Sequence, residues 1–121
     1  MQGTVTPPAI LVVDDDDLLR FLVSRSLVSD GFEVHAASSL VEARAALETR
    51  AFDVVLLDRK LQNEDGLDLV PALARASTAP RLLVTSGAAD VGHLPPGAAF
   101  IAKPYRTAAL TAQVKALLDV A

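Results

Sequence analysis

The segment Ile10–Asp17 reads ILVVDDDD, four apolar residues followed directly by four aspartates. The apolar half shows no polar alternation, which is typical of a parallel strand buried on both faces. The acidic half places carboxylates where that strand ends, and sites in open α/β sheets form at the carboxyl ends of strands. Four adjacent negative charges repel one another unless a cation shares the site. The segment therefore predicts a central first strand with a divalent metal held at its end.

The composition is that of one globular domain. The chain has 121 residues, 51% of them hydrophobic, which is enough to bury a core. Its net charge of −4 argues against a primary role in binding nucleic acid. The absence of cysteine excludes a disulfide scaffold, a thiolate metal site and a cysteine nucleophile. No apolar run has the length of a membrane span, and the start of the chain lacks the features of a signal peptide. We expect a disordered lead-in over residues 1–8, one domain over residues 9–121, a cytoplasmic location and no contact with membranes.

Strand and helix patterns alternate along the chain. The strand Ile10–Val13 is followed by a helix from Asp17, its predicted cap, to about Ser29. In the second helix, Ser39 is the predicted cap and Glu42 completes a capping box. Further strands are expected at Glu33–Ala37, Phe52–Asp58, Arg81–Ser86 and Ala98–Ala102, and further helices at Leu40–Arg50, Gly66–Ala76 and Arg106–Val120.

This alternation predicts a doubly wound α/β fold with a five-stranded parallel sheet in the order 2-1-3-4-5, which is flavodoxin-like. Strands one and three are then neighbours, so the aspartates of strand one should meet Asp58 at one edge. A hydroxyl of Thr85 or Ser86 and the amine of Lys103 should reach the same edge. Each residue alone has a structural explanation, as a helix cap or a loop residue. Four polar groups at four strand ends favour a functional site.

The motifs ILVVDDDDLLR, FDVVLLD, DG at residues 65–66, VTSG and FIAKP occur in the order found in the receiver domain of two-component response regulators, which the chain closely resembles. The resemblance covers about residues 9–120. It implies that Asp58 accepts a phosphoryl group from a histidine kinase or a histidine phosphotransfer protein. It also implies a Mg²⁺ site formed by Asp14, Asp15, Asp58 and the backbone carbonyl of Lys60.

The resemblance assigns further roles to strands four and five. Lys103 would contact a phosphoryl oxygen, and its peptide bond to Pro104 is expected to be cis. A strand-four hydroxyl would contact another phosphoryl oxygen; the SG pairing favours Ser86, whereas the count from the preceding proline favours Thr85. Movement of this hydroxyl would leave space that Phe100 fills, which makes a two-state switch.

Two features of this chain depart from the family pattern, and a third concerns its first helix. Residues 87–97 contain three glycines and two prolines, so we expect the fourth helix to be missing or a single turn. Lys60 is either a solvated loop lysine or a partner of Glu64 or the acid pocket. In the first helix, Leu19, Leu22, Val23, Ser26 and Leu27 form the predicted inward stripe. Leu18 and Phe21 lie outside it, and in receivers this edge of the helix contacts the helical bundle that carries the donor histidine. We therefore expect this pair to form a partner surface.

Other functions use parts of the same pattern. A haloacid-dehalogenase-like Mg²⁺-dependent phosphatase also uses a strand-end aspartate and a lysine, but it requires a second aspartate where Lys60 stands. A flavodoxin-like cofactor binder would need a phosphate loop after strand one, where four aspartates would repel a phosphate. A degenerate receiver would serve only as an interaction module. We predict a phosphoacceptor domain that is not a turnover enzyme, is a monomer or weak homodimer, and makes no direct contact with nucleic acid.

Overall fold

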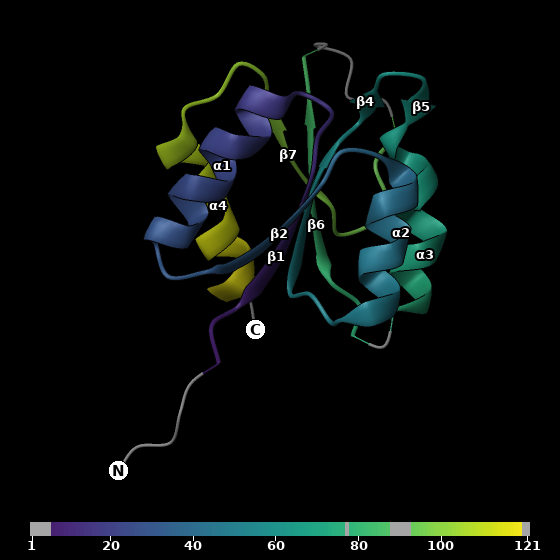
Figure 1. Ribbon diagram of the computed structural model, residues 1–121, viewed down its shortest axis with the longest axis horizontal. Helices are drawn as coiled ribbons and strands as arrows, with labels where there is room; N and C mark the ends of the chain where they lie inside the picture. The colour runs from purple at the N-terminus through teal and green to yellow at the C-terminus, as the bar shows by residue number, and fades with distance from the viewer. Residues whose placement is uncertain (1–5, 77, 88–92, 120–121) are drawn as a thin grey trace.

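A five-stranded parallel sheet forms the centre of the computed structural model, which describes residues 6–76, 78–87 and 93–119 (Figure 1). The strands lie in the order β2-β1-β3-β6-β7, and all four neighbouring pairs are parallel. The bounds of the strands are Ala9–Val13 (β1), Glu33–Ala37 (β2), Val54–Asp58 (β3), Arg81–Ser86 (β6) and Ala99–Ala102 (β7). The predicted order 2-1-3-4-5 is therefore confirmed.

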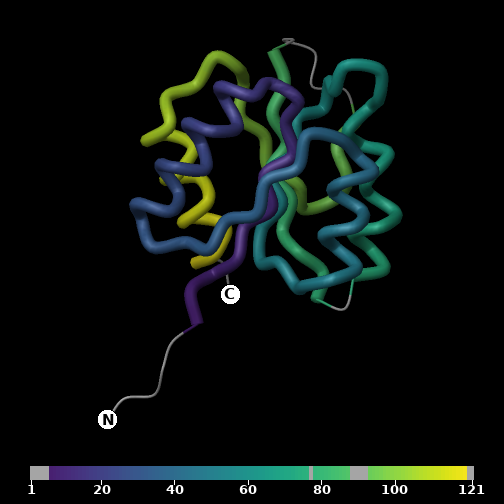
Figure 2. The backbone as a smooth tube through the Cα atoms, in the orientation of Figure 1, coloured from purple at the N-terminus to yellow at the C-terminus, as the bar shows by residue number. Residues whose placement is uncertain are grey.

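Helices cover both faces of the sheet. Helices α1 (Asp17–Ser29) and α4 (Thr107–Asp119) lie on one face, and α2 (Leu40–Thr49) and α3 (Val70–Arg75) lie on the other (Figure 1). The 3₁₀ helix η1 (Gly66–Leu69) leads directly into α3, whose first turn contains a proline. Figure 2 traces the same two layers along the backbone. No helix of the described residues is both long enough and apolar enough to span a membrane.

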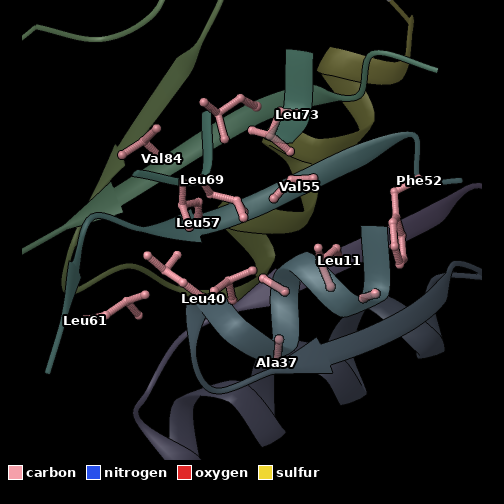
Figure 3. Packing of buried hydrophobic residues seen from close by; sticks show 14 residues of the cluster. Leu11, Ala37, Leu40, Phe52, Val55, Leu57, Leu61, Leu69, Leu73 and Val84 are labelled. Atoms are coloured by element: carbon pink, nitrogen blue, oxygen red, sulfur yellow. The ribbon is translucent and has the colours of Figure 1, made fainter. Parts of the chain in front are cut away.

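Successive strand residues alternate between two hydrophobic clusters, one on each face of the sheet. Leu11 of β1 and Val55 of β3 belong to the cluster under α2 and α3. Figure 3 shows this cluster from close by. Ile10 and Val54 belong to the cluster under α1 and α4. All four side chains are fully buried. The apolar run of β1, which has no alternating polar residues, is thus a strand covered on both faces, as the sequence predicts.

The helix caps differ in detail from the predictions. Asp16, not Asp17, caps α1: its backbone is extended and its Oδ1 accepts a hydrogen bond of 3.0 Å from the N–H of Leu19. The prediction for Asp17 is wrong by one residue, because any aspartate of the run can cap and the turn after β1 leaves Asp16 in the extended conformation. Ser39 caps α2 as predicted. The Glu42 carboxylate accepts from the N–H and hydroxyl of Ser38 instead of closing a capping box.

Two short segments complete the fold. Strands β4 (Lys60–Leu61) and β5 (Glu64–Asp65), which the sequence patterns did not predict, form an antiparallel pair after β3. Between β6 and β7 the structure describes residue 87 and residues 93–98, and none of these is helical. Residues 88–92 of the expected missing helix, and residues 1–5 of the expected lead-in, lie outside the described residues. Leu94 and Ala98 pack against the hydrophobic cluster under α2 and α3.

Candidate functional site

Three carboxylates come together at the carboxyl edge of the sheet. Asp14 directly follows β1, and Asp58 is the last residue of β3. Asp14, Asp15 and Asp58 each offer an oxygen, and these oxygens all lie within 4.8 Å of one another. Asp14 and Asp58 are buried, and Asp15 is half-buried. The register of the two adjacent strands brings these carboxylates together, because β1 pairs with β3 up to Val13 and Leu57.

Lys103 links two of these carboxylates. It follows β7, and its Nζ atom lies 3.0 Å from Oδ2 of Asp58 and 3.1 Å from Oδ2 of Asp14. Its peptide bond to Pro104 is cis, as expected. The ammonium offsets part of the repulsion between the two buried carboxylates.

The pKa values of Asp58 and Lys103 are each set by opposing effects. Burial raises the pKa of Asp58, although the hydrogen bonds from Lys103 and the Lys60 backbone act in the other direction. Burial alone would lower the pKa of Lys103, but its hydrogen bonds to Asp58 and Asp14 outweigh that effect and raise it. The lysine is therefore a firmly held cation beside a carboxyl group, that of Asp58, which is costly to ionise.

The side chain of Asp58 is held at both oxygens. Oδ1 accepts a hydrogen bond of 3.1 Å from the backbone N–H of Lys60, and Oδ2 accepts one from Lys103. The side chain of Lys60 is exposed, and no ion pair with Glu64 is formed among the residues that the structure describes. Glu64 instead accepts a hydrogen bond of 3.4 Å from the N–H of Leu40.

The two candidate hydroxyls lie on opposite faces of β6. Both Thr85 and Ser86 are buried. Thr85 shares the face of Leu83, under α1 and α4, and stands opposite Asp58 in the strand register. Ser86 follows the alternation of Val84, which belongs to the other cluster. Phe100 packs against that same cluster, so Ser86 and Phe100 share a face of the sheet.

A hydrophobic surface on α1 lies beside the acidic residues. Leu18 and Phe21 are 67% and 56% exposed, and the Arg25 guanidinium lies 5.7 Å from the centre of the Phe21 ring. Leu22, predicted to face inward, is also exposed, at 45%. The prediction for Leu22 is wrong because the buried residues of α1 are Val23 and Leu27, and Leu22 lies about 100° around the helix from Val23.

Sequence patterns did not single out two residues that border the site. Arg20 reaches the backbone carbonyl of Asp14 from one turn into α1. Tyr105 is half-buried, and burial together with the nearby charge of Asp14 raises its pKa to about 12. A basic residue one helical turn after an acidic loop, and an aromatic residue directly after the Lys-Pro pair, are signals that could have identified them.

The fold is a doubly wound parallel α/β domain with an acidic site at the carboxyl edge of its sheet. The chain belongs to the response regulator receiver domain family, whose model matches residues 10–115.

Similar proteins include regulators that are longer than this chain. It is 32% identical to the protein PetR of Rhodobacter capsulatus, over 95% of this chain and 50% of PetR. It is 38% identical to the regulatory protein VirG of Agrobacterium fabrum, over 92% of this chain and 46% of VirG. The chain thus spans about half the length of these relatives.

Solved receiver structures have the same fold. A receiver domain protein from Methanospirillum hungatei matches with a TM-score of 0.86 and 28% identity, over 94% of this chain and 95% of that one. The receiver domain of the hybrid histidine kinase CckA matches with a TM-score of 0.81 and 27% identity, over 92% of this chain and 99% of that one.

Proposed function

We propose that this domain is the phosphoacceptor of a two-component phosphorelay, in which Asp58 receives a phosphoryl group from a phosphohistidine in the presence of Mg²⁺. One observation carries the proposal: the buried Asp58 carboxylate is oriented at one oxygen by the Lys60 N–H and at the other by Lys103. Two further carboxylates stand within reach of a shared cation. The donor would be a histidine kinase or a histidine phosphotransfer protein.

The donor set suits Mg²⁺. This ion prefers hard oxygen ligands and is commonly held by a few carboxylates while it keeps several waters. Asp14, Asp15 and Asp58 would hold it, with the backbone carbonyl of Lys60 as a further ligand. When bound, the ion would offset negative charge on the transferring phosphoryl oxygens.

The residues of the chain would divide the chemical work. An oxygen of the Asp58 carboxylate attacks phosphorus, the phosphorus–nitrogen bond of the donor breaks, and an acyl phosphate forms. The leaving imidazole nitrogen keeps the electron pair of that bond and takes up a proton. Lys103 would donate to a phosphoryl oxygen, a charge-assisted hydrogen bond about twice as strong as a neutral one.

Phosphorylation would be reported through a hydroxyl at the end of β6. Ser86 is the better candidate, because it shares the sheet face of Phe100, whereas Thr85 lies on the opposite face. A hydroxyl drawn toward the phosphoryl group would leave space into which Phe100, now half-buried, can move. The changed surface would then alter contacts with other proteins.

The alternative functions have less support. A haloacid-dehalogenase-like phosphatase would need a carboxylate at residue 60, where the structure has an exposed lysine. A degenerate receiver would have lost part of the acceptor site, whereas the aspartates and the lysine are all in place.

Phosphorylation by a small phosphodonor with Mg²⁺ tests the proposal. Intact-mass measurement should detect one hydroxylamine-sensitive phosphoryl group on the native domain and none on Asp58→Asn. Asp68→Asn, which changes an exposed aspartate on η1, is the matched control and should be modified like the native domain. No adduct on the native domain favours the degenerate receiver. Continuous turnover of a phosphate ester without a stable adduct favours the phosphatase.

A further inference from the structure

Arg20 connects helix α1 to the acidic loop that precedes it. Its Nη1 donates a hydrogen bond of 2.7 Å to the backbone carbonyl of Asp14, and its Nη2 donates one of 2.6 Å to Oδ1 of Asp17. The side chain is only 20% exposed. A guanidinium is a planar fork with rigidly placed donors, whereas the ammonium of a lysine is a compact charge whose donors rotate.

The bond from Arg20 is one of several hydrogen bonds that hold the backbone and the carboxylate of Asp14. The Asp14 N–H donates to the carbonyl of Ala37 at 3.1 Å, and Oδ1 accepts from the N–H of Asp16 at 2.9 Å. Oδ2 accepts from Lys103. The carbonyl bond to Arg20 therefore fixes the peptide unit that joins Asp14 to Asp15. These are the two strand-one carboxylates at the candidate metal site.

We propose that Arg20 is a positioning residue for the Mg²⁺ site: by holding the Asp14 carbonyl, it keeps the carboxylates of Asp14 and Asp15 directed at the ion. This inference rests on the metal site of the proposed function. Four consecutive aspartates repel one another, so a loop without this contact would be free to separate its carboxylates.

The cationic charge of Arg20 and its hydrogen bonds have opposite effects on metal affinity. As a positive charge, Arg20 would weaken the binding of a cation, but its pairing with the exposed Asp17 offsets much of that charge. As a contact behind the ligands, it would strengthen binding, and loss of such partners typically costs about 10- to 100-fold in affinity. The second effect is the larger one, so removal of Arg20 should weaken binding.

Direct measurement of Mg²⁺ affinity tests this inference without any need for phosphorylation. Mg²⁺ titrations followed by backbone amide NMR shifts would compare native protein with Arg20→Met, which keeps the length of the side chain but removes its charge and donors. We expect Mg²⁺ to bind about tenfold more weakly. Asp17→Asn removes the negative charge beside Arg20 but leaves its bond to the Asp14 carbonyl, so it should weaken Mg²⁺ binding less than Arg20→Met does. Arg20→Lys keeps the charge but loses the fork, and should fall between the two.

Each result is decisive. Mg²⁺ binding by Arg20→Met at native or higher affinity would overturn the inference, since higher affinity is what a purely electrostatic role predicts. If Arg20→Met does not fold, the Mg²⁺ affinity of Arg20→Lys is the test. A native affinity in Arg20→Lys would also overturn the inference. If the native domain binds no Mg²⁺, the metal site of the proposed function fails as well. If the native domain and Arg20→Met bind Mg²⁺ equally well, the proposed function stands and only the role of Arg20 is excluded.

Discussion

Gly66 packs directly against the backbone of Asp58, so that a Cβ atom on Gly66 would overlap the Asp58 carbonyl oxygen. Such a Cβ would also lie 3.1 Å from the Cα of Arg59. The Gly66 N–H donates to the carbonyl of Arg59 at 2.6 Å, which fixes this close approach. The start of η1 thus packs closely against the end of β3 that carries Asp58, and only a hydrogen atom fits on the Cα of Gly66.

Gly66→Ala is therefore expected to destabilise the domain. Forced overpacking of this kind typically costs about 1–3 kcal/mol. The displaced backbone should also disturb the Lys60 N–H that orients Asp58. Urea unfolding measures the first effect, and small-donor phosphorylation of the folded variant measures the second. Gly87→Ala is the control, because a Cβ there meets nothing within 4 Å, and its free energy of unfolding should stay within about 0.5 kcal/mol of native. Equal stabilities for the two variants would contradict this account.

Asp58→Asn is expected to raise the free energy of unfolding at neutral pH in buffer without Mg²⁺. Burial raises the pKa of Asp58 above its ordinary value, despite the opposing hydrogen bonds. The folded domain therefore binds this proton more tightly than the unfolded chain, whose pKa is about 4. The penalty of the buried charge is present at neutral pH and is relieved as the pH falls through the folded pKa. The advantage of Asp58→Asn should accordingly shrink in mildly acidic buffer. Urea unfolding at the two pH values tests this, and a less stable variant at neutral pH would contradict it.

Sequence patterns predicted the fold because its strongest determinants are local. The apolar runs at residues 10–13 and 54–57 allow no solvent-facing side, and parallel strands covered by helices follow from that. Strand order then brings Asp14, Asp58 and Lys103 to one edge, without any knowledge of side-chain contacts. The sequence alone therefore predicted that the acidic and basic residues at these strand ends lie at one edge of the sheet.

Contacts that depend on side-chain reach could not be predicted in this way. Periodicity indicates which face of α1 Arg20 occupies, but not that its guanidinium turns back to the Asp14 carbonyl. The choice of Asp16 over Asp17 as the cap depends on one backbone conformation in a run of identical residues. Leu22 fits the helical spacing of the predicted inward stripe and is nevertheless exposed, because the stripe that the rest of the domain buries is narrower and is centred on Val23 and Leu27.

Tyr105, the only tyrosine, gives a direct optical probe of the site. Burial and the charge of Asp14 raise its pKa to about 12, whereas an unfolded chain titrates near 10. The folded state holds the phenolic proton longer, so this contribution to stability is complete below about pH 10 and is lost as the pH rises through about 12. Phenolate absorbance, recorded directly after rapid mixing into alkaline buffer, measures the pKa of Tyr105 in the folded domain before the domain unfolds. Asp14→Asn should lower it, and a native midpoint near 10 would contradict the prediction.

Lys103→Met should separate metal binding from phosphoryl transfer. Without the ammonium, Asp14 and Asp58 lose a competing cation, so Mg²⁺ should bind more tightly than in the native domain. Transfer from a small donor should nevertheless slow by about 10- to 100-fold, the rate equivalent of one charge-assisted hydrogen bond of about 1.5–3 kcal/mol. Metal titration and timed intact-mass measurements provide the two values. Weaker Mg²⁺ binding together with an unchanged transfer rate would exclude both assigned roles of the lysine.

The exposed pair Leu18 and Phe21 should matter for the protein donor alone. Leu18→Ser combined with Phe21→Ser removes apolar surface beside the site without touching the buried residues of α1, Val23 and Leu27. Transfer from a phosphorylated histidine kinase or phosphotransfer protein should fall, because that donor must dock on the domain, whereas a small phosphodonor needs no docking surface. Val41→Ser, at a residue 71% exposed on α2, controls for the loss of apolar surface elsewhere. Equal losses with both kinds of donor would mean that the double substitution damages the site, and no loss with either would mean that the partner docks elsewhere.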